Sequence, residues 1–344
     1  MRKVIISDVA KNANVSKSTV SQYLNKRYEY MGVDTKRRIE KSIKELGFQA
    51  NIVARSLKVK QTSTIGVIVA NILHDFSTKV IRAIEDACNK ENFHIIVCNA
   101  DDDPVKEKQY IEMLIAKQVD GLIIFPTGGN YELYSEMTEK GFPLVFIDRL
   151  VKGLAVDSVL LDNKHAMELA VKHLVDKGHS KIGIVTTSLL RNVTPRVERV
   201  SGFVETMNKQ GLEVNNEWIK GLEIQEIQNG LKQMLSQNPS PTAIIAGNDL
   251  TMMEILRYAV KNNLNIPKDF ALIGVDELAF ADIFTPSLST ISQPAFKMGN
   301  AAATLLLNKI NKSNKTEPSI HRFRGELKVG KSTIYSRYSK RVNS

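Results

Sequence analysis

From Thr64 onward, short continuous apolar runs alternate with amphipathic stretches of helical period. The apolar runs lie at residues 65–70, 95–98, 122–125, 144–147, 159–161, 182–185, 243–246 and 271–275, with helical patterns at 79–90, 106–117, 166–177 and 200–210. Apolar strands that alternate with helices are typical of parallel sheets covered on both faces. These strands are too many for one ordinary sheet, so the pattern predicts two α/β lobes. A ligand would bind beyond the carboxyl ends of the strands, in the cleft between the lobes.

The charge is distributed unevenly along the chain. Residues 1–60 hold 14 Lys and Arg against 5 Asp and Glu, residues 61–320 hold 26 against 31, and residues 321–344 hold 7 against 1. The net charge of +10 therefore divides into +9, −5 and +6. A basic N-terminal segment of domain size is typical of a nucleic-acid-binding protein. The alternative is a solvated basic tail.

Composition excludes several other classes of protein. With 43% hydrophobic residues, the chain can bury a large core and is not disordered. Two cysteines cannot form a disulfide scaffold, which fits a reducing cytosol. No apolar run reaches the ~18 residues of a membrane span, and residues 1–9 lack the apolar segment of a secretory signal. We therefore expect a cytoplasmic protein of two or three units.

The first sixty residues have the pattern of three short helices. Apolar residues at helical spacing predict a helix over 7–13, and Asn14 suits a turn that needs a positive φ. Ser16 suits the N-cap of a second helix over 17–25. Asp34 is the expected cap of a third helix over 35–46, which Gly47 would end. This order predicts an all-α helix-turn-helix head, whose second helix enters the DNA major groove.

Residues 6–25, ISDVAKNANVSKSTVSQYLN, closely resemble the opening of the lactose-repressor (LacI/GalR) family of bacterial regulators. Residues 47–57, GFQANIVARSL, resemble the hinge of the same family. The resemblance implies that the hinge folds into a helix on operator DNA and that a leucine wedges into the minor groove. Two positions depart from the family pattern. Gln22 stands where members often carry Arg, which affects base preference, and Ala50 stands where many carry Pro, which loosens helix entry.

The head supplies candidate DNA contacts of two kinds. Lys17, Ser18 and Gln22 project from the first turns of the second helix, where Gln can pair with adenine and Lys with guanine; alternatively they only face solvent. The candidates for phosphate contacts, which fix register, are Thr19, Ser21, Asn25, Arg2 and Lys3. In the hinge, the resemblance assigns DNA contacts to Asn51, Ala54 and Leu57. Leu57 is the expected wedge, or else the packing residue of the hinge.

The family resemblance continues through the body, in QVDGLII at 118–124, PLVFIDR at 143–149, LVDKGH at 174–179, ND at 248–249, IGVD at 273–276 and STISQP at 289–294. It implies an effector domain similar to periplasmic sugar-binding proteins, with two lobes and three strand crossings. The implied domains are a head at 1–48, a hinge at 49–60, an effector-binding and dimerisation domain at 61–330 and a basic tail at 331–344. One lobe would hold about 61–161 and 292–330, and the other about 162–291.

Polar residues at strand ends are the candidate effector contacts. Asp249 and Asp276 each follow an apolar strand and could accept hydrogen bonds from ligand hydroxyls, or could cap the following helix. Asp148 and Arg149 follow another strand, and an ion pair between lobes is the alternative for Arg149. The resemblance places an effector-gripping arginine at Arg199. The other candidates either lie on elements that line the cleft in relatives or are close in sequence to the residues above. They are His74, Asp75, Phe76, Arg196, Asn248 and Gln293.

Arginines cluster in the segment 191–199, RNVTPRVER. Because guanidinium groups match carboxylates bidentately, this cluster predicts an anionic effector, and we expect an acidic sugar. Within the family, the chain looks most like regulators of pectin and sugar-acid catabolism that respond to 2-keto-3-deoxygluconate.

Other motifs do not support an enzyme, a cofactor or a metal site. Residues 325–332, GELKVGKS, fit the phosphate-binding P-loop pattern, but only twelve residues follow and they do not read as a helix. The acidic run at 101–103 is expected to form a turn before a helix at Pro104. The histidines show no zinc-binding spacing, Cys88 and Cys98 are expected to be buried, and no hydrolase elbow occurs.

Taken together, the residues predict a ligand-controlled transcription regulator, with a repressor as the expected type. Its partners would be a pseudo-palindromic DNA operator, a small effector and a second copy of the chain, because the tail lacks the heptads that a tetramer would need. We expect the effector to release DNA; the alternative is a co-repressor. A stand-alone sugar-binding protein is a further alternative, which the basic first sixty residues oppose.

Overall fold

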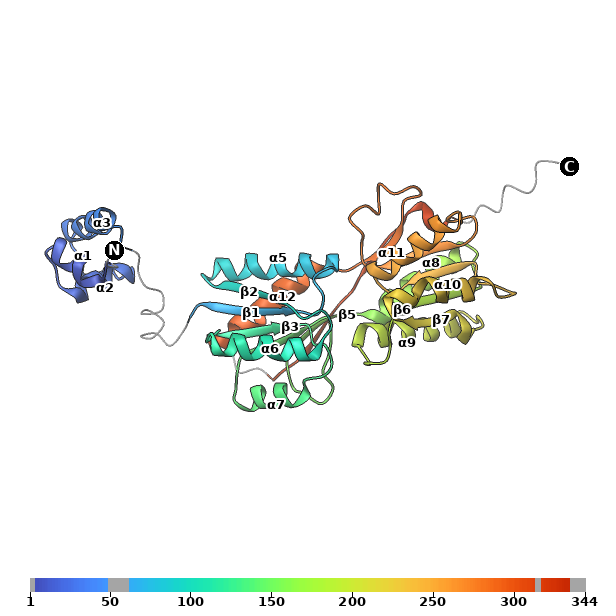
Figure 1. Ribbon diagram of the computed structural model, residues 1–344, viewed down its shortest axis with the longest axis horizontal. Coiled ribbons are helices and arrows are strands. Elements are labelled where there is room, and N and C mark those ends of the chain that lie inside the picture. The colour runs from blue at the N-terminus through green and yellow to red at the C-terminus, as the bar shows by residue number, and fades with distance from the viewer. Residues whose placement is uncertain (1–3, 49–61, 313–316, 335–344) are drawn as a thin grey trace. The chain divides into compact units, whose positions relative to one another are not determined.

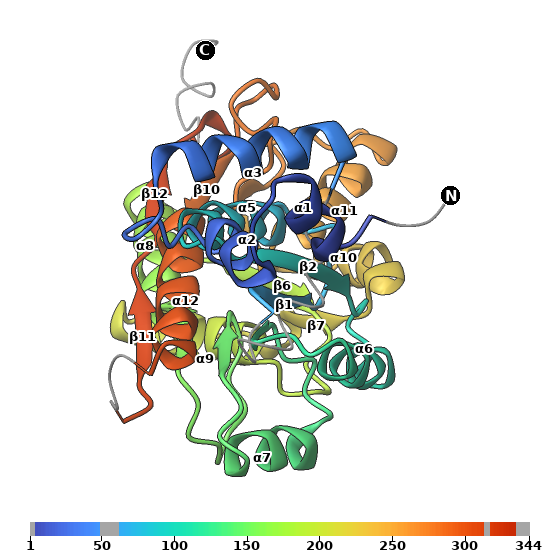
Figure 2. The same cartoon turned by 90° about the vertical axis from the view of Figure 1, so that its left-hand side faces the viewer.

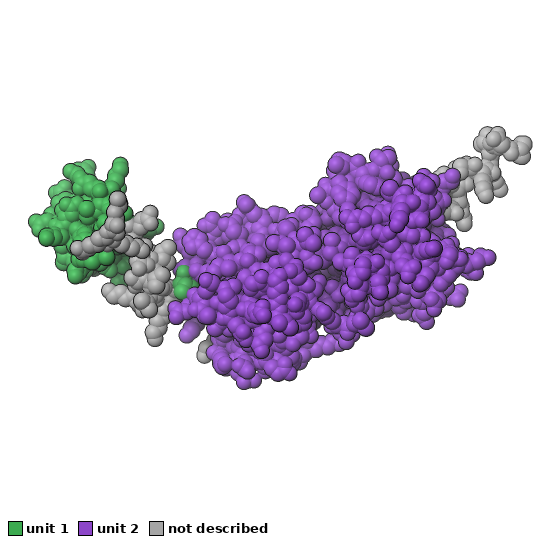
Figure 3. Space-filling model, viewed as in Figure 1, with its two compact units in different colours: residues 1–62 green, residues 63–344 purple. Residues whose placement is uncertain are grey.

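The computed structural model describes residues 4–48, 62–312 and 317–334 (Figure 1). The chain divides into two compact units, residues 1–62 and residues 63–344 (Figure 3). The first unit is all α-helical, and the second is an α/β body with two sheets. This is the fold class that the sequence predicts. Within the described ranges, every helix is too short or too polar to cross a membrane.

The head consists of three helices, α1 (Ile6–Asn12), α2 (Lys17–Leu24) and α3 (Val33–Leu46). Its core is formed by apolar side chains from all three, chiefly Val9, Ala10, Ala13, Val20 and Ile39. Asn14 has a φ of 53°, as the tight turn between α1 and α2 requires. The Ser16 Oγ atom accepts a hydrogen bond of 3.0 Å from the Thr19 amide and so caps α2.

The third helix begins differently from the prediction. Gly32 is the N-cap of α3 and makes no side-chain capping bond, so Asp34 lies inside the first turn and does not cap the helix. An acidic side chain in the first turn still favours the positive end of the helix dipole, which explains why the pattern pointed to Asp34. At the other end, Gly47 has a φ of 58° and ends α3 as predicted.

The first lobe is built on a six-stranded parallel sheet with the order β11-β5-β4-β3-β1-β2. Its strands are β1 (Thr64–Val69), β2 (His94–Asn99), β3 (Gly121–Ile124), β4 (Leu144–Ile147), β5 (Ser158–Leu161) and β11 (Ile320–Phe323), which forms one edge (Figure 2). One face packs against α5 (Asp75–Lys90) and α12 (Ala295–Ile310). The other face packs against α6 (Pro104–Ala116) and α7 (Tyr131–Glu139).

The second lobe has a six-stranded sheet with the order β12-β10-β9-β8-β6-β7. Its strands are β6 (Ile182–Thr187), β7 (Ile219–Leu222), β8 (Ala243–Ala246), β9 (Ala271–Val275), β10 (Ser289–Ser292) and the antiparallel β12 (Glu326–Lys328). Helices α8 (Asn163–Asp176) and α9 (Thr194–Lys209) cover one face, and α10 (Ile227–Leu235) and α11 (Asp249–Lys261) cover the other. Short 3₁₀ turns lie at Asn216–Trp218, Ile224–Glu226 and Lys331–Thr333.

All eight predicted apolar runs form strands, with ends within two residues of those expected. The strands that the pattern missed are β7, β10, β11 and β12. Three of them, β7, β11 and β12, contain charged residues and so lack a continuous apolar run. They lie at sheet edges, where a strand is less buried and can carry charged side chains.

The chain passes between the lobes three times, after β5, after β10 and after β11. The last passage differs from the expected lobe boundary. Residues 326–328 pair with β10 in the second sheet, although we expected all of 292–330 in the first lobe. Gly325 permits this turn, since a Cβ there would stand 2.9 Å from the Ile291 Cγ2 atom and 3.1 Å from the Ser292 carbonyl oxygen.

Candidate functional site

The exposed face of α2 carries the predicted base-reading residues. Lys17, Ser18 and Gln22 are exposed, and residues 18 and 22 share a helix face because they are four positions apart. The first turn of α2 holds no acidic residue, so no side chain there neutralises the positive end of this helix. This face therefore offers polar side chains and a positive helix end together.

The predicted phosphate contacts of the head differ in accessibility. Asn25 is exposed and donates its side-chain amide to the Ser21 carbonyl oxygen at 2.8 Å, while Thr19 and Ser21 are half-buried. Five further candidates, Arg2, Lys3, Asn51, Ala54 and Leu57, lie outside the described residues. The hinge at 49–60 also lies outside them.

A small cavity of about 40 Å³ lies between the two lobes of the body, which is room for only a few water molecules. It brings together most of the predicted effector residues, namely His74, Phe76, Asp148, Arg149, Arg196, Arg199, Asn248, Asp276 and Gln293. The cavity lies at the carboxyl ends of strands from both sheets, because Asp148 directly follows β4 and Asp276 directly follows β9.

Sequence reasoning missed several residues that line the cavity, namely Ala70, Asn71, Ser77, Phe125 and Pro195. Ala70 and Phe125 directly follow β1 and β3, so their position after an apolar run could have identified them. The other three carry no signal in the sequence that distinguishes them from ordinary loop or helix residues.

Asp75 and Asp249 lie beside this cavity, at a direct contact between the lobes. The Nδ1 atom of His74 lies 2.5 Å from the Asp249 Oδ1 atom, and the Asp75 amide donates to Asp249 Oδ2 at 3.0 Å. Asn248, not Asp249, is the N-cap of α11, since its Oδ1 atom accepts from the Thr251 amide at 2.8 Å. The carboxylate of Asp249 is therefore engaged by the opposite lobe.

Two strand-end aspartates have left-handed backbone conformations. Asp148 has a φ of 66° and Asp276 a φ of 74°. Residues other than glycine rarely adopt this conformation, and it concentrates at binding sites, where it aims a side chain off the end of a strand. The Asp276 side chain is buried and accepts a hydrogen bond of 2.5 Å from Gln293 Nε2. Burial raises the pKa of Asp276 to about 6, although the charge of Arg199 opposes the rise.

Gln293 presents an unpaired acceptor at the cavity. Its Nε2 atom is committed to Asp276, while its Oε1 atom is buried and has no hydrogen-bond partner among the described residues. A buried acceptor without a donor is costly, and a ligand hydroxyl group would satisfy it. Together, Asp276 and Gln293 form a polar pair that suits a hydroxylated ligand.

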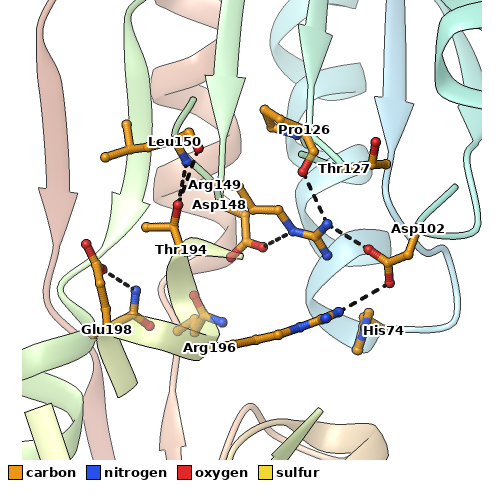
Figure 4. A network of polar contacts seen from close by, with 12 residues as sticks. His74, Asp102, Pro126, Thr127, Asp148, Arg149, Leu150, Thr194, Arg196 and Glu198 are labelled. Atoms are coloured by element: carbon orange, nitrogen blue, oxygen red, sulfur yellow. Dashed lines mark hydrogen bonds and ion pairs between the residues drawn. The ribbon is translucent and has the colours of Figure 1, made fainter. Parts of the chain in front are cut away.

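The three cavity arginines are held by different partners. Arg199 is buried; its Nε donates to Asn163 Oδ1 at 2.8 Å and its Nη1 to the Gly247 carbonyl oxygen at 2.5 Å. Arg149 Nη1 donates to Asp102 Oδ1 at 2.7 Å, within the first lobe, and to the Pro126 carbonyl oxygen at 3.2 Å (Figure 4). Arg199 thus orders the second lobe, and Arg149 orders the first.

Arg196, and not Arg149, makes an ion pair between the lobes. Its Nη2 atom lies 3.5 Å from Asp102 Oδ2, across the cleft (Figure 4). Burial raises the pKa of the Asp102 carboxyl, but the charges of Arg149 and Arg196 outweigh this effect and lower it overall. Asp102 was expected only to form a turn before α6, and nothing in the sequence pairs it with arginines so distant along the chain.

The P-loop-like segment has a structural role. Ser332 is fully buried, donates its hydroxyl to the Leu272 carbonyl oxygen at 2.6 Å and accepts from the Ser289 amide at 2.8 Å. It lies in a 3₁₀ turn of three residues, not at the start of a long helix. The segment therefore anchors the end of the described chain to β9 and β10.

Comparison with family models and known proteins agrees with this architecture. A model of bacterial regulatory proteins of the lacI family matches residues 5–51, and a model of periplasmic binding proteins and the sugar-binding domain of the LacI family matches residues 62–327. The probable HTH-type transcriptional regulator EndR of Paenibacillus polymyxa is 48% identical over 89% of this chain and 90% of its own. The HTH-type transcriptional regulator KdgR of Bacillus subtilis is 31% identical over 89% and 91%.

Solved structures give the same fold. The lac repressor dimer bound to operator and the anti-inducer ONPF superimposes with a TM-score of 0.83, at 22% identity, over 97% of this chain and 100% of its own. A complex of the transcriptional regulator CelR with cellobiose gives a TM-score of 0.72, at 22% identity, over 96% of this chain and 100% of that one.

Proposed function

Because the chain belongs to the lacI family of bacterial regulatory proteins, it is a DNA-binding transcriptional regulator, and we propose that it represses a sugar or sugar-acid catabolic operon until a small effector releases it. The proteins that it matches are regulators, and the chain is not an enzyme. The observation that carries the proposal is the capped, polar face of α2 in a basic head, combined with a polar cavity between two lobes.

The proposed operator contact follows from the chemistry of α2. Gln22 can pair with adenine and Lys17 with guanine in the major groove, while Ser18 can bond to either. The net charge of +9 in residues 1–60 attracts the phosphates and makes binding depend on salt. Two heads in a homodimer would read two half-sites of a pseudo-palindrome.

Salt-dependent DNA binding tests this part of the proposal. Fluorescence anisotropy with a labelled duplex at several salt concentrations should give an affinity that falls steeply as salt rises. A chain lacking residues 1–60 should lose this binding. Unchanged binding by the shortened chain would contradict the assignment to the head.

The proposed effector is an acidic sugar such as 2-keto-3-deoxygluconate. Arg149, Arg196 and Arg199 put three guanidinium groups on the cavity, and Asp276 with Gln293 offers partners for hydroxyl groups. Isothermal titration with this acid and with neutral hexoses is the test, and we expect tighter binding of the acid. Tighter binding of a neutral sugar would overturn the proposal.

We also propose that the effector acts by shifting the arrangement of the lobes. The cavity is small while the contacts between the lobes are intact, so we expect the effector to favour an arrangement with more room between the lobes. It can change operator affinity only by its preference for one arrangement over the other. A gel shift should show release of DNA on adding effector; tighter binding would instead indicate a co-repressor.

The homodimer is proposed from an apolar surface on the second lobe. Met253, Leu256, Val260, Phe280 and Phe284 line an open groove between α11 and the segment that follows β9. Val260 is 72% exposed, which is unusual for an aliphatic residue in such a patch. Sedimentation should give a dimer for the full chain and a monomer for Val260→Glu. Val105→Glu, at an exposed valine on α6, should leave the dimer intact.

A further inference from the structure

Asp102 lies at the meeting point of three arginines from two lobes. Its carboxylate contacts Arg149 of the first lobe at 2.7 Å and Arg196 of the second lobe at 3.5 Å (Figure 4). Its backbone carbonyl oxygen accepts a hydrogen bond from Arg191, also of the second lobe. Its amide donates to the Ala70 carbonyl oxygen at 2.6 Å, which ties this loop to the end of β1.

Asp102 changes the charge that a ligand would meet. Arg149 and Arg196 line the cavity, whereas Asp102 does not. The Asp102 carboxylate therefore neutralises these guanidinium groups from outside the cavity. Asp148 and Asp276 add two carboxylates that face the cavity itself. With Arg199, the three arginines of the cavity are matched by Asp102, Asp148 and Asp276, and His74 is matched by Asp249. An acidic ligand therefore meets no net positive charge while Asp102 stays in place.

We propose that Asp102 is a specificity-determining residue that competes with the effector's anionic group for Arg196 and bridges the lobes while no ligand is bound. This inference rests on the proposed sugar-acid effector. A ligand carboxylate would replace Asp102 as the partner of Arg196 and break the ion pair across the cleft. The charge of the ligand would in this way be coupled to the arrangement of the lobes.

The contacts indicate which arginine a ligand carboxylate would bind. Arg149 makes two hydrogen bonds in its own lobe, to Asp102 at 2.7 Å and to the Pro126 carbonyl oxygen at 3.2 Å. Its Nε atom lies 3.5 Å from Asp148 but makes no hydrogen bond among the described residues. Arg196 has one further bond, to the Ser188 carbonyl oxygen at 3.0 Å in its own lobe. Its longer contact with Asp102 is therefore the one that a bidentate carboxylate would replace.

Breaking this pair loosens one side of the cleft. On the same side, the Leu150 amide of the first lobe donates to the Thr194 hydroxyl of the second lobe at 2.9 Å (Figure 4). Thr194 and Arg196 lie on the first turn of α9, so a shift of this turn moves both contacts together. The ion pair and the hydrogen bond then act as one bridge.

The first experiment compares full-length Asp102→Asn with the wild type, using D-galacturonate and D-galactose as probes in isothermal titration. We expect the ratio of galacturonate to galactose affinity to rise about fivefold in the variant, the size of one partly buried ion pair. Asp101→Asn is the matched control, because Asp101 is exposed and its side-chain partners among the described residues, Asn99 and Lys106, belong to its own lobe. An unchanged or lower ratio in Asp102→Asn overturns the proposal.

The second experiment needs no ligand and separates this inference from the proposed function. If the wild type binds none of 2-keto-3-deoxygluconate, galacturonate and galactose, the effector proposal fails. The bridge is then decided by hydrogen–deuterium exchange of the free protein. Peptides covering residues 189–196 should exchange several-fold faster in Asp102→Asn and in Arg196→Gln than in the wild type. The double variant should exchange no faster than either single variant. Exchange at the wild-type rate in both single variants would overturn the bridge.

Discussion

His74 and Asp249 join the two lobes through a contact of 2.5 Å between Nδ1 and Oδ1. Burial lowers the pKa of His74, but the hydrogen bond and the charge of Asp249 outweigh it and raise the pKa overall. For Asp249 the balance is the reverse, since burial raises its pKa while His74 lowers it overall. Both shifts favour the ionised forms of this pair, which joins a helix start in each lobe.

The bridge should make stability depend on pH. Because the folded pKa of His74 is raised, its contribution is complete below the unfolded value of 6.5 and is lost as pH rises through the folded value. Asp249 contributes above its unfolded value of 3.8 and loses this contribution as pH falls through its lowered folded value. We predict that His74→Gln costs about 1–3 kcal/mol between these limits and less at alkaline pH.

Urea unfolding at several pH values measures this difference. His94→Gln is the control, because His94 is exposed on β2. The difference between wild type and His74→Gln should shrink as pH rises above 6.5, while the control follows the wild type. A difference that does not vary with pH would contradict the ionised bridge.

Asp276→Asn should stabilise the protein and impair ligand binding. The folded pKa of Asp276 is about 6, above its usual 3.8, so the ionised form is disfavoured in the folded state. The resulting destabilisation is absent below about pH 3.8, grows as pH rises to about 6 and is constant above. At pH 7 the amide should therefore add on the order of 1–3 kcal/mol to the free energy of unfolding.

Urea unfolding at pH 7 and at pH 4.5 tests the Asp276 prediction. The gain of Asp276→Asn over the wild type should fall toward zero at the lower pH. Asp282→Asn, at an exposed aspartate of the same lobe, should give no gain at either pH. An Asp276→Asn variant less stable than wild type at pH 7 would show that the carboxylate is favoured by its surroundings.

Gln22→Ala should weaken DNA binding at one base position. If Gln22 pairs with adenine, its loss removes about 1–3 kcal/mol of discrimination there and little elsewhere. The measurement is anisotropy on an operator selected from random duplexes, with each base pair substituted in turn. Lys41→Ala, at an exposed lysine of α3, should keep the base preferences. An equal loss on every duplex would make Gln22 a phosphate contact.

Ser332→Ala should destabilise the second lobe by about 1–3 kcal/mol. The substitution leaves the Ser289 amide and the Leu272 carbonyl oxygen unpaired in a buried place. Lys331→Ala removes an exposed side chain of the same motif and should leave stability unchanged. Urea unfolding gives both values, and a fluorescent ATP analogue should bind neither variant nor wild type. ATP binding that Lys331→Ala abolishes would restore the P-loop interpretation.

Local features of the sequence predicted local structure well. The buried strands follow from uninterrupted apolar runs, the start of α2 follows from Ser16, and the end of α3 follows from Gly47. Each of these features depends on residues within a few positions of one another, so a short segment of sequence is enough to predict it. The prediction that Asp34 caps α3 was wrong. An acidic residue is common both at the N-cap and in the first turn of a helix, so the sequence pattern does not separate the two positions.

The sequence could predict which residues lie at the cavity, but not which residues they contact. Asp148 and Asp276 could be named because each directly follows an apolar strand, and Arg199 because the family resemblance places an arginine there. Their partners could not, since Asp102 meets Arg196 across 94 positions of sequence and His74 meets Asp249 across 175. Likewise, only the antiparallel pairing of β12 with β10 puts residues 326–328 in the second sheet.

The sequence alone determined the helix-turn-helix head and the two α/β lobes, because periodicity, capping and turn residues act over short distances. The family was identified by the resemblance of its motifs. Tertiary structure decided how the polar groups of the cleft are paired: Asp102 with two arginines, Asp249 with His74, and Gln293 with Asp276. The physical reason is that charge interactions depend on distance in space and on burial. Both are fixed only when the two sheets have brought distant strand ends together.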